Sequence, residues 1–180
     1  MAPIRTFGHG TASQEEIVDL LRAAGIEEVV DVRRYPGSRR HPHVATDAMA
    51  RWLPEAGIAY RHLPSLGGRR KPAADSPNVG LRNDQFRAYG DHMATDEFAE
   101  GIADLLESAD DHPVAIMCSE SVWWRCHRRL VSDHLVLVEE RPVEHLFHDG
   151  RLTAHDPLET ARRDDGHVVY DVGVDRPLSG

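Results

Sequence analysis

Short apolar segments alternate with segments of helical period along this chain, and that alternation most constrains its fold. In residues 29–32 the β-branched run is interrupted only by Asp31, as in a parallel strand buried on both faces. Similar segments at 4–7, 58–63 and 114–117 predict further strands, and 143–147 predicts an edge strand. Strands alternating with helices require right-handed crossovers, so the sequence predicts a mostly parallel sheet.

The helical segments complete this prediction. Ile17, Leu20 and Leu21 share one helix face, with Thr11 or Ser13 placed to cap the helix and Gly25 to end it. Further helices are expected over residues 47–55, 84–93, 96–107 and 122–138. We therefore predict a single three-layer α/β domain with about four to five strands and helices on both faces. It covers residues 1–148, and a polar strap or tail follows at 149–180.

Length and composition exclude several classes of protein. The 180 residues fit one domain, and no stretch approaches the roughly 20 apolar residues that span a bilayer. Residues 1–5 lead directly into the first strand and leave no room for a secretory signal. Two cysteines, Cys118 and Cys126, are too few for a secreted disulfide scaffold. We expect a cytoplasmic protein with no membrane partner.

The net charge of −9 is distributed unevenly. Residues 31–87 carry ten Arg and one Lys against five acids, a net charge of +6. Residues 88–180 carry eight Arg against twenty acids, a net charge of −12. A basic segment attracts anions, so we expect an anionic small molecule or a nucleic acid as partner. The alternative is that these arginines are solvated or paired with acids.

Polar residues follow the predicted strands at the point where each strand ends. In parallel sheets, ligands bind outside the carboxyl ends of the strands. We therefore expect one pocket, lined by residues from separate segments of the chain: His9, Asp31, Arg33, Cys118 and Glu120.

Three of these residues are candidates for proton transfer. His9 lies between two glycines and can act as a general acid or base; the alternative is a turn histidine bonded to backbone. Asp31 is costly in an apolar strand unless it is paired, so it either orients His9 in an acid–base relay or anchors Arg33. Glu120 either acts as a general base or caps the following helix.

An arginine-rich loop follows the second strand and predicts anion binding. Arg33 and Arg39 carry guanidinium groups that match phosphate geometry, and Ser38 adds a hydroxyl. Arg128, from a later segment, is expected at the same site. A solvated loop without a defined role is the alternative.

Cys118 is a candidate nucleophile. It ends the fourth strand before a predicted helix, where backbone amides and the helix dipole lower a thiol pKa. Cysteine-dependent phosphatases and sulfurtransferases use a glycine-containing loop, which is absent here. Met117 rather than His precedes the cysteine, and Arg125 comes one residue late for the phosphatase spacing. A buried, inert cysteine is the alternative.

Zinc-type ligands occur in the same segments, at Cys118, Cys126, His127 and His9. Their spacing lacks the paired ligands usual in zinc sites, so the sequence predicts no metal site. The sequence also requires no cofactor.

Six short motifs, in this order, resemble the domain of unknown function 488 family: Gly8-His9, Val30-Asp31-Val32-Arg33, Pro36-Gly37-Ser38-Arg39-Arg40, Leu66-Gly67-Gly68-Arg69, Met117-Cys118-Ser119-Glu120 and Cys126-His127-Arg128-Arg129. The resemblance covers residues 4–147. One departure is Gly10-Thr11, where that family commonly has Ser-Asn. The resemblance implies an α/β fold with these motifs gathered at one site, and it supplies no function.

Our leading hypothesis is an enzyme that acts on a phosphate-bearing substrate, either a nucleotide or a nucleic acid. The first alternative is a non-catalytic nucleic-acid binding module that stacks bases on Trp123, Trp124 or Tyr35. The second is a cysteine-dependent sulfur-transfer enzyme centred on Cys118. A binding module has no use for a buried Asp31 beside His9, which favours the enzyme.

Overall fold

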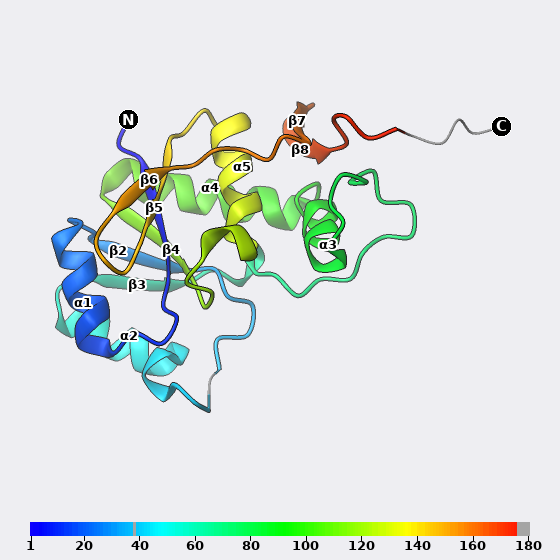
Figure 1. Ribbon diagram of the computed structural model, residues 1–180. Helices are drawn as coiled ribbons and strands as arrows, with labels where there is room; N and C mark the ends of the chain where they lie inside the picture. The colour runs from blue at the N-terminus through cyan, green and yellow to red at the C-terminus, as the bar shows by residue number, and fades with distance from the viewer. Residues whose placement is uncertain (38, 176–180) are drawn as a thin grey trace.

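The computed structural model describes residues 1–37 and 39–175 (Figure 1). Its main sheet has the strand order β3-β2-β4-β1-β5-β6, with bounds β1 (Ile4–Gly8), β2 (Glu28–Asp31), β3 (Ala59–His62), β4 (Val114–Cys118), β5 (Val143–Leu146) and β6 (Leu152–Ala154). Strands β1 to β5 are parallel and β6 is antiparallel to β5. The predicted mostly parallel α/β sheet is confirmed. The strand expected at the sheet edge, β5, lies instead between β1 and β6, because the segment after residue 148 adds β6.

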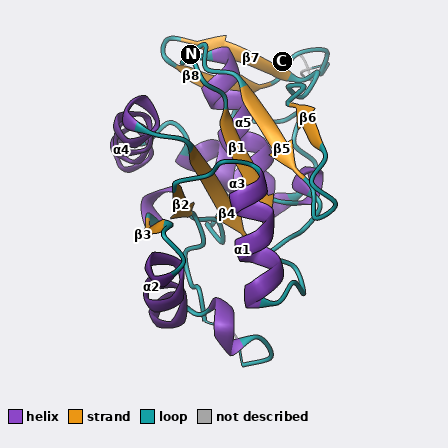
Figure 2. Ribbon diagram, turned by 90° about the vertical axis from the view of Figure 1, so that its left-hand side faces the viewer, coloured by secondary structure: helices purple, strands orange, loops and turns teal. Residues whose placement is uncertain are grey.

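Helices cover both faces of this sheet, which confirms the three layers (Figures 1 and 2). The helices are α1 (Gln14–Ala23), α2 (Thr46–Glu55), α3 (Asp84–His92), α4 (Asp96–Asp111) and α5 (Arg128–Leu137), with 3-10 helices η1 (Pro42–Val44), η2 (Pro64–Leu66) and η3 (Trp123–Arg125). Helices α1 and α2 pack on one face, and α3, α4 and α5 pack on the other. No helix in the described part of the chain is long and apolar enough to cross a bilayer.

Strand alternation sorts the side chains of β2 and β4 between the two faces. Met117 packs with the α1/α2 layer, whereas Cys118 packs with the α3–α5 layer. On β2, Val29 packs with the α1/α2 layer, and Asp31 shares that side because it is two residues further along. The register pairs Asp31 with Met117 rather than with Cys118. The polar side chains that end β2 and β4 therefore point to opposite faces.

The helix predicted over residues 122–138 starts later than expected. The 3-10 helix η3 comes first, then Cys126 has extended backbone (φ −117°, ψ 150°), and α5 begins only at Arg128. Arg128 is buried, and its guanidinium donates to the Glu120 carbonyl (2.6 Å), which holds the intervening segment against the core. Cys118 therefore has no helix directly after it.

A chain of buried hydrogen bonds runs from β1 and α5 into the segment after residue 148. Arg128 Nη1 donates to Thr6 Oγ1 (3.2 Å), and the Thr6 hydroxyl donates to His145 Nδ1 (2.6 Å). His145 Nε2 donates to His155 Nδ1 (2.8 Å), whose Nε2 donates to Asp133 Oδ1 (2.7 Å). Burial lowers the pKa of His145 to about 3, so this ring is neutral and one tautomer satisfies its contacts. We call these residues the buried hydrogen-bond chain.

Residues 161–170 contribute a further donor to the buried hydrogen-bond chain. Strands β7 (Ala161–Asp164) and β8 (His167–Tyr170) form a hairpin that packs on α5 (Figure 1). The Tyr170 hydroxyl donates to Asp133 Oδ2 (2.9 Å), and Tyr170 is fully buried. Both His155 and Tyr170 thus supply donors to one buried carboxylate of α5.

Replacing His155 should destabilise the fold strongly. His155→Phe removes a donor to Asp133 and the acceptor for His145, leaving buried polar groups without partners, and should lower the free energy of unfolding by about 3 kcal/mol. Urea denaturation checks this value. His167→Phe, on β8 but outside the buried hydrogen-bond chain, should change this free energy by less than about 0.5 kcal/mol. Equal losses in the two variants would contradict the role given to the buried hydrogen-bond chain.

Candidate functional site

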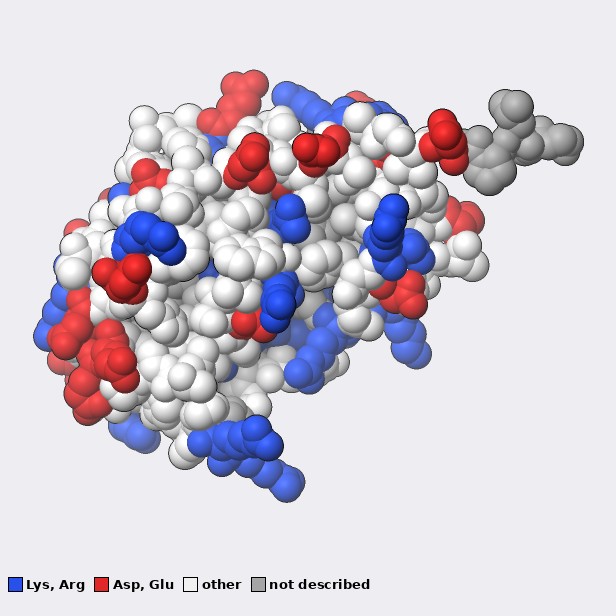
Figure 3. Space-filling model, in the orientation of Figure 1, with Lys and Arg blue, Asp and Glu red and all other residues white. Residues whose placement is uncertain are grey.

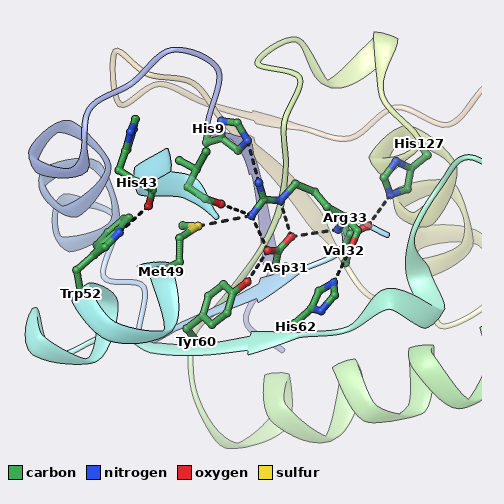
Figure 4. A network of polar contacts seen from close by, with 11 residues as sticks. His9, Asp31, Val32, Arg33, His43, Met49, Trp52, Tyr60, His62 and His127 are labelled. Atoms are coloured by element: carbon green, nitrogen blue, oxygen red, sulfur yellow. Dashed lines mark hydrogen bonds and ion pairs between the residues drawn. The ribbon is translucent and has the colours of Figure 1, made fainter. Parts of the chain in front are cut away.

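A buried ion pair occupies the carboxyl end of β2 (Figure 4). Arg33 binds Asp31 through two bonds, from Nε to Oδ1 (2.9 Å) and from Nη2 to Oδ2 (2.7 Å). The same guanidinium donates to the Val44 carbonyl (2.7 Å), and Tyr60 donates its hydroxyl to Asp31 Oδ2 (2.5 Å). Burial and the Asp31 carboxylate raise the pKa of Tyr60 well above its ordinary value, so the phenol remains a donor. Asp31 therefore anchors Arg33, one of the two roles that the sequence left open.

His9 lies on the far side of the Arg33 guanidinium (Figure 4). Its Nδ1 donates to the Gly10 carbonyl (2.9 Å), which leaves Nε2 to accept from Arg33 Nη1 (3.3 Å). Burial lowers the pKa of His9 to about 4, and the Arg33 charge acts in the same direction. Arg33 thus separates His9 from Asp31 and bonds to both, so the acid–base relay is not formed by direct contact.

Gly8, which precedes His9, lets the backbone of the loop after β4 approach closely. A Cβ on Gly8 would lie 1.8 Å from the Glu120 carbonyl oxygen, so only glycine permits this approach. The amides of His9 and Gly10 donate to the carbonyls of Cys118 and Ser119 (3.0 and 2.9 Å). The glycine brings the loops after β1 and β4 together.

A second polar cluster lies on the α3–α5 side and consists of Cys118, Cys126 and His127. The two sulfur atoms lie 3.8 and 3.7 Å from His127 Nδ1. His127 Nε2 donates to the Val32 carbonyl (3.0 Å), so Nδ1 faces the sulfur atoms with its lone pair in the neutral ring. The sequence signal for this cluster was present in Cys126-His127, which we expected inside a helix. The sequence grouped Cys118, Cys126 and His127, with His9, as zinc-type ligands, and the three meet here because the extended backbone at Cys126 keeps Cys126 and His127 out of α5.

Burial and a shared hydrogen bond shift the pKa values of both thiols. The hydrogen bond with Cys126, together with burial, raises the pKa of Cys118 well above the ordinary thiol value. Burial also disfavours a thiolate at Cys126, yet the hydrogen bond with Cys118, the His127 ring and the Arg128 charge lower its pKa well below that value. The helix N-terminus from which the sequence predicted a lowered pKa at Cys118 does not follow β4 directly.

A cavity of about 350 Å³ opens above the second cluster. Its floor consists of Cys118, Cys126 and His127, and Phe86 and Tyr89 of α3 form an apolar wall. Arg33 and Glu120 also line the cavity, but His9 and Asp31 do not. Of the five residues expected in one pocket, the structure therefore places three in the cavity and two behind Arg33.

The remaining anion-binding candidates are not gathered at this cavity. Arg128 is buried beneath the loop after β4, where it bonds to Thr6 and to the Glu120 backbone. Arg39 is exposed and does not line the cavity, and Ser38 lies outside the described residues. The guanidinium of Arg33 is already bonded to Asp31, Val44 and His9.

The basic side chains at the cavity are instead Arg34, Arg69 and Arg125. Basic side chains also lie along the hollowed part of the face shown in Figure 3. Arg34 neighbours a predicted residue, and Arg69 belongs to a motif that marked the family resemblance. Arg125 was judged only by its distance from Cys118 in sequence. Their common location depends on three loops, so sequence spacing alone did not reveal it.

Removing the charge of Asp31 should cost stability. Asp31→Asn leaves a buried guanidinium without its counter-ion and should lower the free energy of unfolding by about 3–5 kcal/mol. Tyr60→Phe removes one hydrogen bond to the same carboxylate and should cost about 1 kcal/mol. Chemical denaturation of both variants measures the two free energies of unfolding and checks that Asp31→Asn loses more than Tyr60→Phe. A stable Asp31→Asn protein would show that the ion pair does not hold this end of the sheet.

Comparisons with known proteins identify a family. The family model described as Domain of unknown function DUF488 matches residues 13–135. No curated protein and no solved structure matches the chain. The matched range contains the ion pair of Asp31 and Arg33 and the cluster of Cys118, Cys126 and His127. Because the match spans more than half of the sequence, the resemblance expected from the motifs is confirmed, and the chain belongs to the family Domain of unknown function DUF488.

Proposed function

We propose that the protein is an enzyme that acts on a phosphate-bearing substrate, a nucleotide or a segment of nucleic acid, in the cavity above Cys118 and His127. The observation that carries the proposal is the composition of this cavity. Arginines line its opening, and titratable side chains form its floor. Sites with convergent polar and titratable groups in an apolar pocket are typical of enzymes.

The arginines at the opening support anion binding. Within the described residues, Arg34, Arg69 and Arg125 form no ion pair with a carboxylate. Arg34 Nη1 donates to the Arg69 carbonyl (2.9 Å), which links two of the loops. Arg69 has a left-handed backbone (φ 58°) although it is not glycine, and such strain concentrates at functional sites. A phosphate group would supply the anion that these guanidinium groups lack.

The dimensions of the cavity favour a small ligand or a single nucleotide unit. Its volume of about 350 Å³ lies at the lower end of the range for small-molecule sites. Phe86 and Tyr89 provide an apolar wall against which a base or sugar can pack. An extended nucleic acid would place one unit in the cavity and contact the surrounding basic loops with the rest.

The two alternatives are less well supported. Tyr35 and Trp124 are exposed (61% and 44%) and available for base stacking, as a binding module requires. Trp123 is not available because its ring stacks on His145, with ring centroids 4.1 Å apart. A sulfur-transfer enzyme centred on Cys118 is disfavoured because neither a glycine-containing loop nor a helix N-terminus follows that buried thiol directly.

Arginine substitutions at the opening should weaken anion binding. Arg69→Ala and Arg125→Ala should each reduce affinity for a nucleoside triphosphate or a short oligonucleotide about tenfold or more, because each removes a charge-assisted hydrogen bond. Arg163→Ala is the matched control, an exposed arginine of β7 outside the cavity and its loops, and should change affinity less than about twofold. Titrations at two salt concentrations check both values, since binding through charge weakens with salt. Equal effects of all three substitutions would point to nonspecific attraction.

Glu120 separates an enzyme from a binding module. It is the one carboxylate among the described residues that line the cavity, and it remains a candidate general base. Once a screen of nucleotides, phosphoesters and oligonucleotides yields turnover, Glu120→Gln should lower kcat at least about 100-fold. Affinity should stay equal or increase, because a negative charge near the anion is removed. Full turnover in this variant would exclude Glu120 from the chemistry.

A further inference from the structure

The side chains on the cavity floor form a compact set of potential metal ligands. The sulfur atoms of Cys118 and Cys126 and a ring nitrogen of His127 all lie within 4.8 Å of one another. Zinc bound tetrahedrally, with Zn–S near 2.3 Å and Zn–N near 2.0–2.1 Å, separates sulfur from nitrogen by about 3.6 Å. The two S···N distances here are 3.8 and 3.7 Å. Both S···N distances thus match those of a zinc coordination sphere, and the two sulfur atoms lie within 4.8 Å of each other.

Hydrogen bonds to the backbone orient His127 and Cys126 in the way that is usual for metal ligands. A histidine that binds a metal commonly donates its other ring N–H to a carbonyl or carboxylate. His127 does so through Nε2 to Val32 (3.0 Å), which directs Nδ1 toward the sulfur atoms. The backbone amide of Arg128 donates to Cys126 Sγ (3.5 Å), and hydrogen bonds of this kind stabilise a metal-bound thiolate. These contacts hold Nδ1 and Sγ in place without occupying the space between them.

The loop above the cluster leaves space next to the ligand nitrogen. A Cβ on Gly68 would lie 3.2 Å from His127 Nδ1, so any larger residue would crowd this side of the ring. Gly68 itself lines the cavity together with the three ligand residues. Glycine at this position therefore leaves the cavity side of the ring free of a side chain.

We propose that Cys118, Cys126 and His127 bind one zinc ion and leave its fourth coordination position open to the cavity. The donor set of two thiolates and one imidazole suits zinc, and three protein ligands with one open position are the pattern of catalytic zinc sites. His9, the fourth ligand considered from the sequence, is bonded to Gly10 and Arg33 and takes no part. Water or an oxygen of the bound anion completes the coordination.

The first experiment measures metal in the wild-type protein. The full chain is produced without a polyhistidine tag, purified under reducing conditions, incubated with zinc and dialysed. Elemental analysis should find about one zinc per chain. Less than about a tenth of an equivalent, or a stoichiometric disulfide between the two cysteines in the reduced preparation, overturns the proposal. A bound iron–sulfur cluster overturns it as well.

Variants then assign the ligands. Cys118→Ser, Cys126→Ser and His127→Gln should each lower bound zinc at least about tenfold. The matched control is His62→Gln, because His62 also donates to a backbone carbonyl next to the cavity (Arg33 O, 2.7 Å) but does not belong to the cluster. This variant should keep its full zinc content. Zinc loss equal to that of His127→Gln would mean that the loss reflects folding rather than ligation.

Cobalt keeps the proposal testable where a cysteine variant does not fold. Cobalt(II) bound to the wild-type protein should give intense visible bands from tetrahedral geometry and a near-ultraviolet thiolate charge-transfer band. Bound cobalt without the thiolate band overturns the site. Adding free imidazole, a neutral ligand of cobalt(II), should alter the visible bands, because it reaches the open position. A spectrum that imidazole does not change overturns the open position.

Metal binding does not depend on the proposed function, so the two proposals fail separately. Arg69→Ala and Arg125→Ala should lose anion affinity and keep zinc. A wild-type protein that holds zinc but binds no phosphate-bearing ligand refutes the proposed function and leaves the metal site intact. A protein that binds such ligands but no zinc refutes the metal site alone.

Discussion

The carboxylate buried at the end of β2 sets the geometry of everything around it. Asp31 lies where a parallel sheet excludes water, so it requires a cation, and Arg33 folds back to supply one. The bonds from Arg33 back to Asp31 fix the backbone between the two residues. The carbonyls of Val32 and Arg33 then face outward and accept from His127 and His62. The side chains of Asp31 and Arg33 form the ion pair that contacts His9. The Val32 carbonyl between them holds His127 of the second cluster.

The topology of the sheet explains why these clusters are neighbours but remain distinct. Strand β4 lies between β2 and β1, so the loops after all three strands meet. The pleat then sends Asp31 toward α2 and Cys118 toward α5, because the register aligns Asp31 with Met117. Arg33 is the one of these residues that reaches both environments, since it binds Asp31 and also lines the cavity. The carboxyl ends of these strands thus carry a buried ion pair and, separately, the cluster of Cys118, Cys126 and His127.

The sequence predicted most of the fold because its elements have strong local signals. The apolar runs and helical periods marked the five parallel strands and the five α-helices, although the start of α5 was predicted too early. The need of Asp31 for a partner was also readable, because burial of a lone carboxylate is costly. What stayed hidden depended on register and loop packing. A one-residue offset decides the face of Cys118, the extended backbone at Cys126 delays α5, and three loops bring Arg34, Arg69 and Arg125 together.

The buried hydrogen-bond chain also defines how much of the protein must fold as one piece. The family match covers residues 13–135, yet Asp133 within it takes donors from His155 and Tyr170 outside it. Arg128 likewise depends on Thr6 of β1. A fragment cut at the matched boundaries would retain a buried anion and a buried cation stripped of these contacts. The contacts that satisfy these two buried charges therefore extend beyond the recognisable family segment, from β1 through β8.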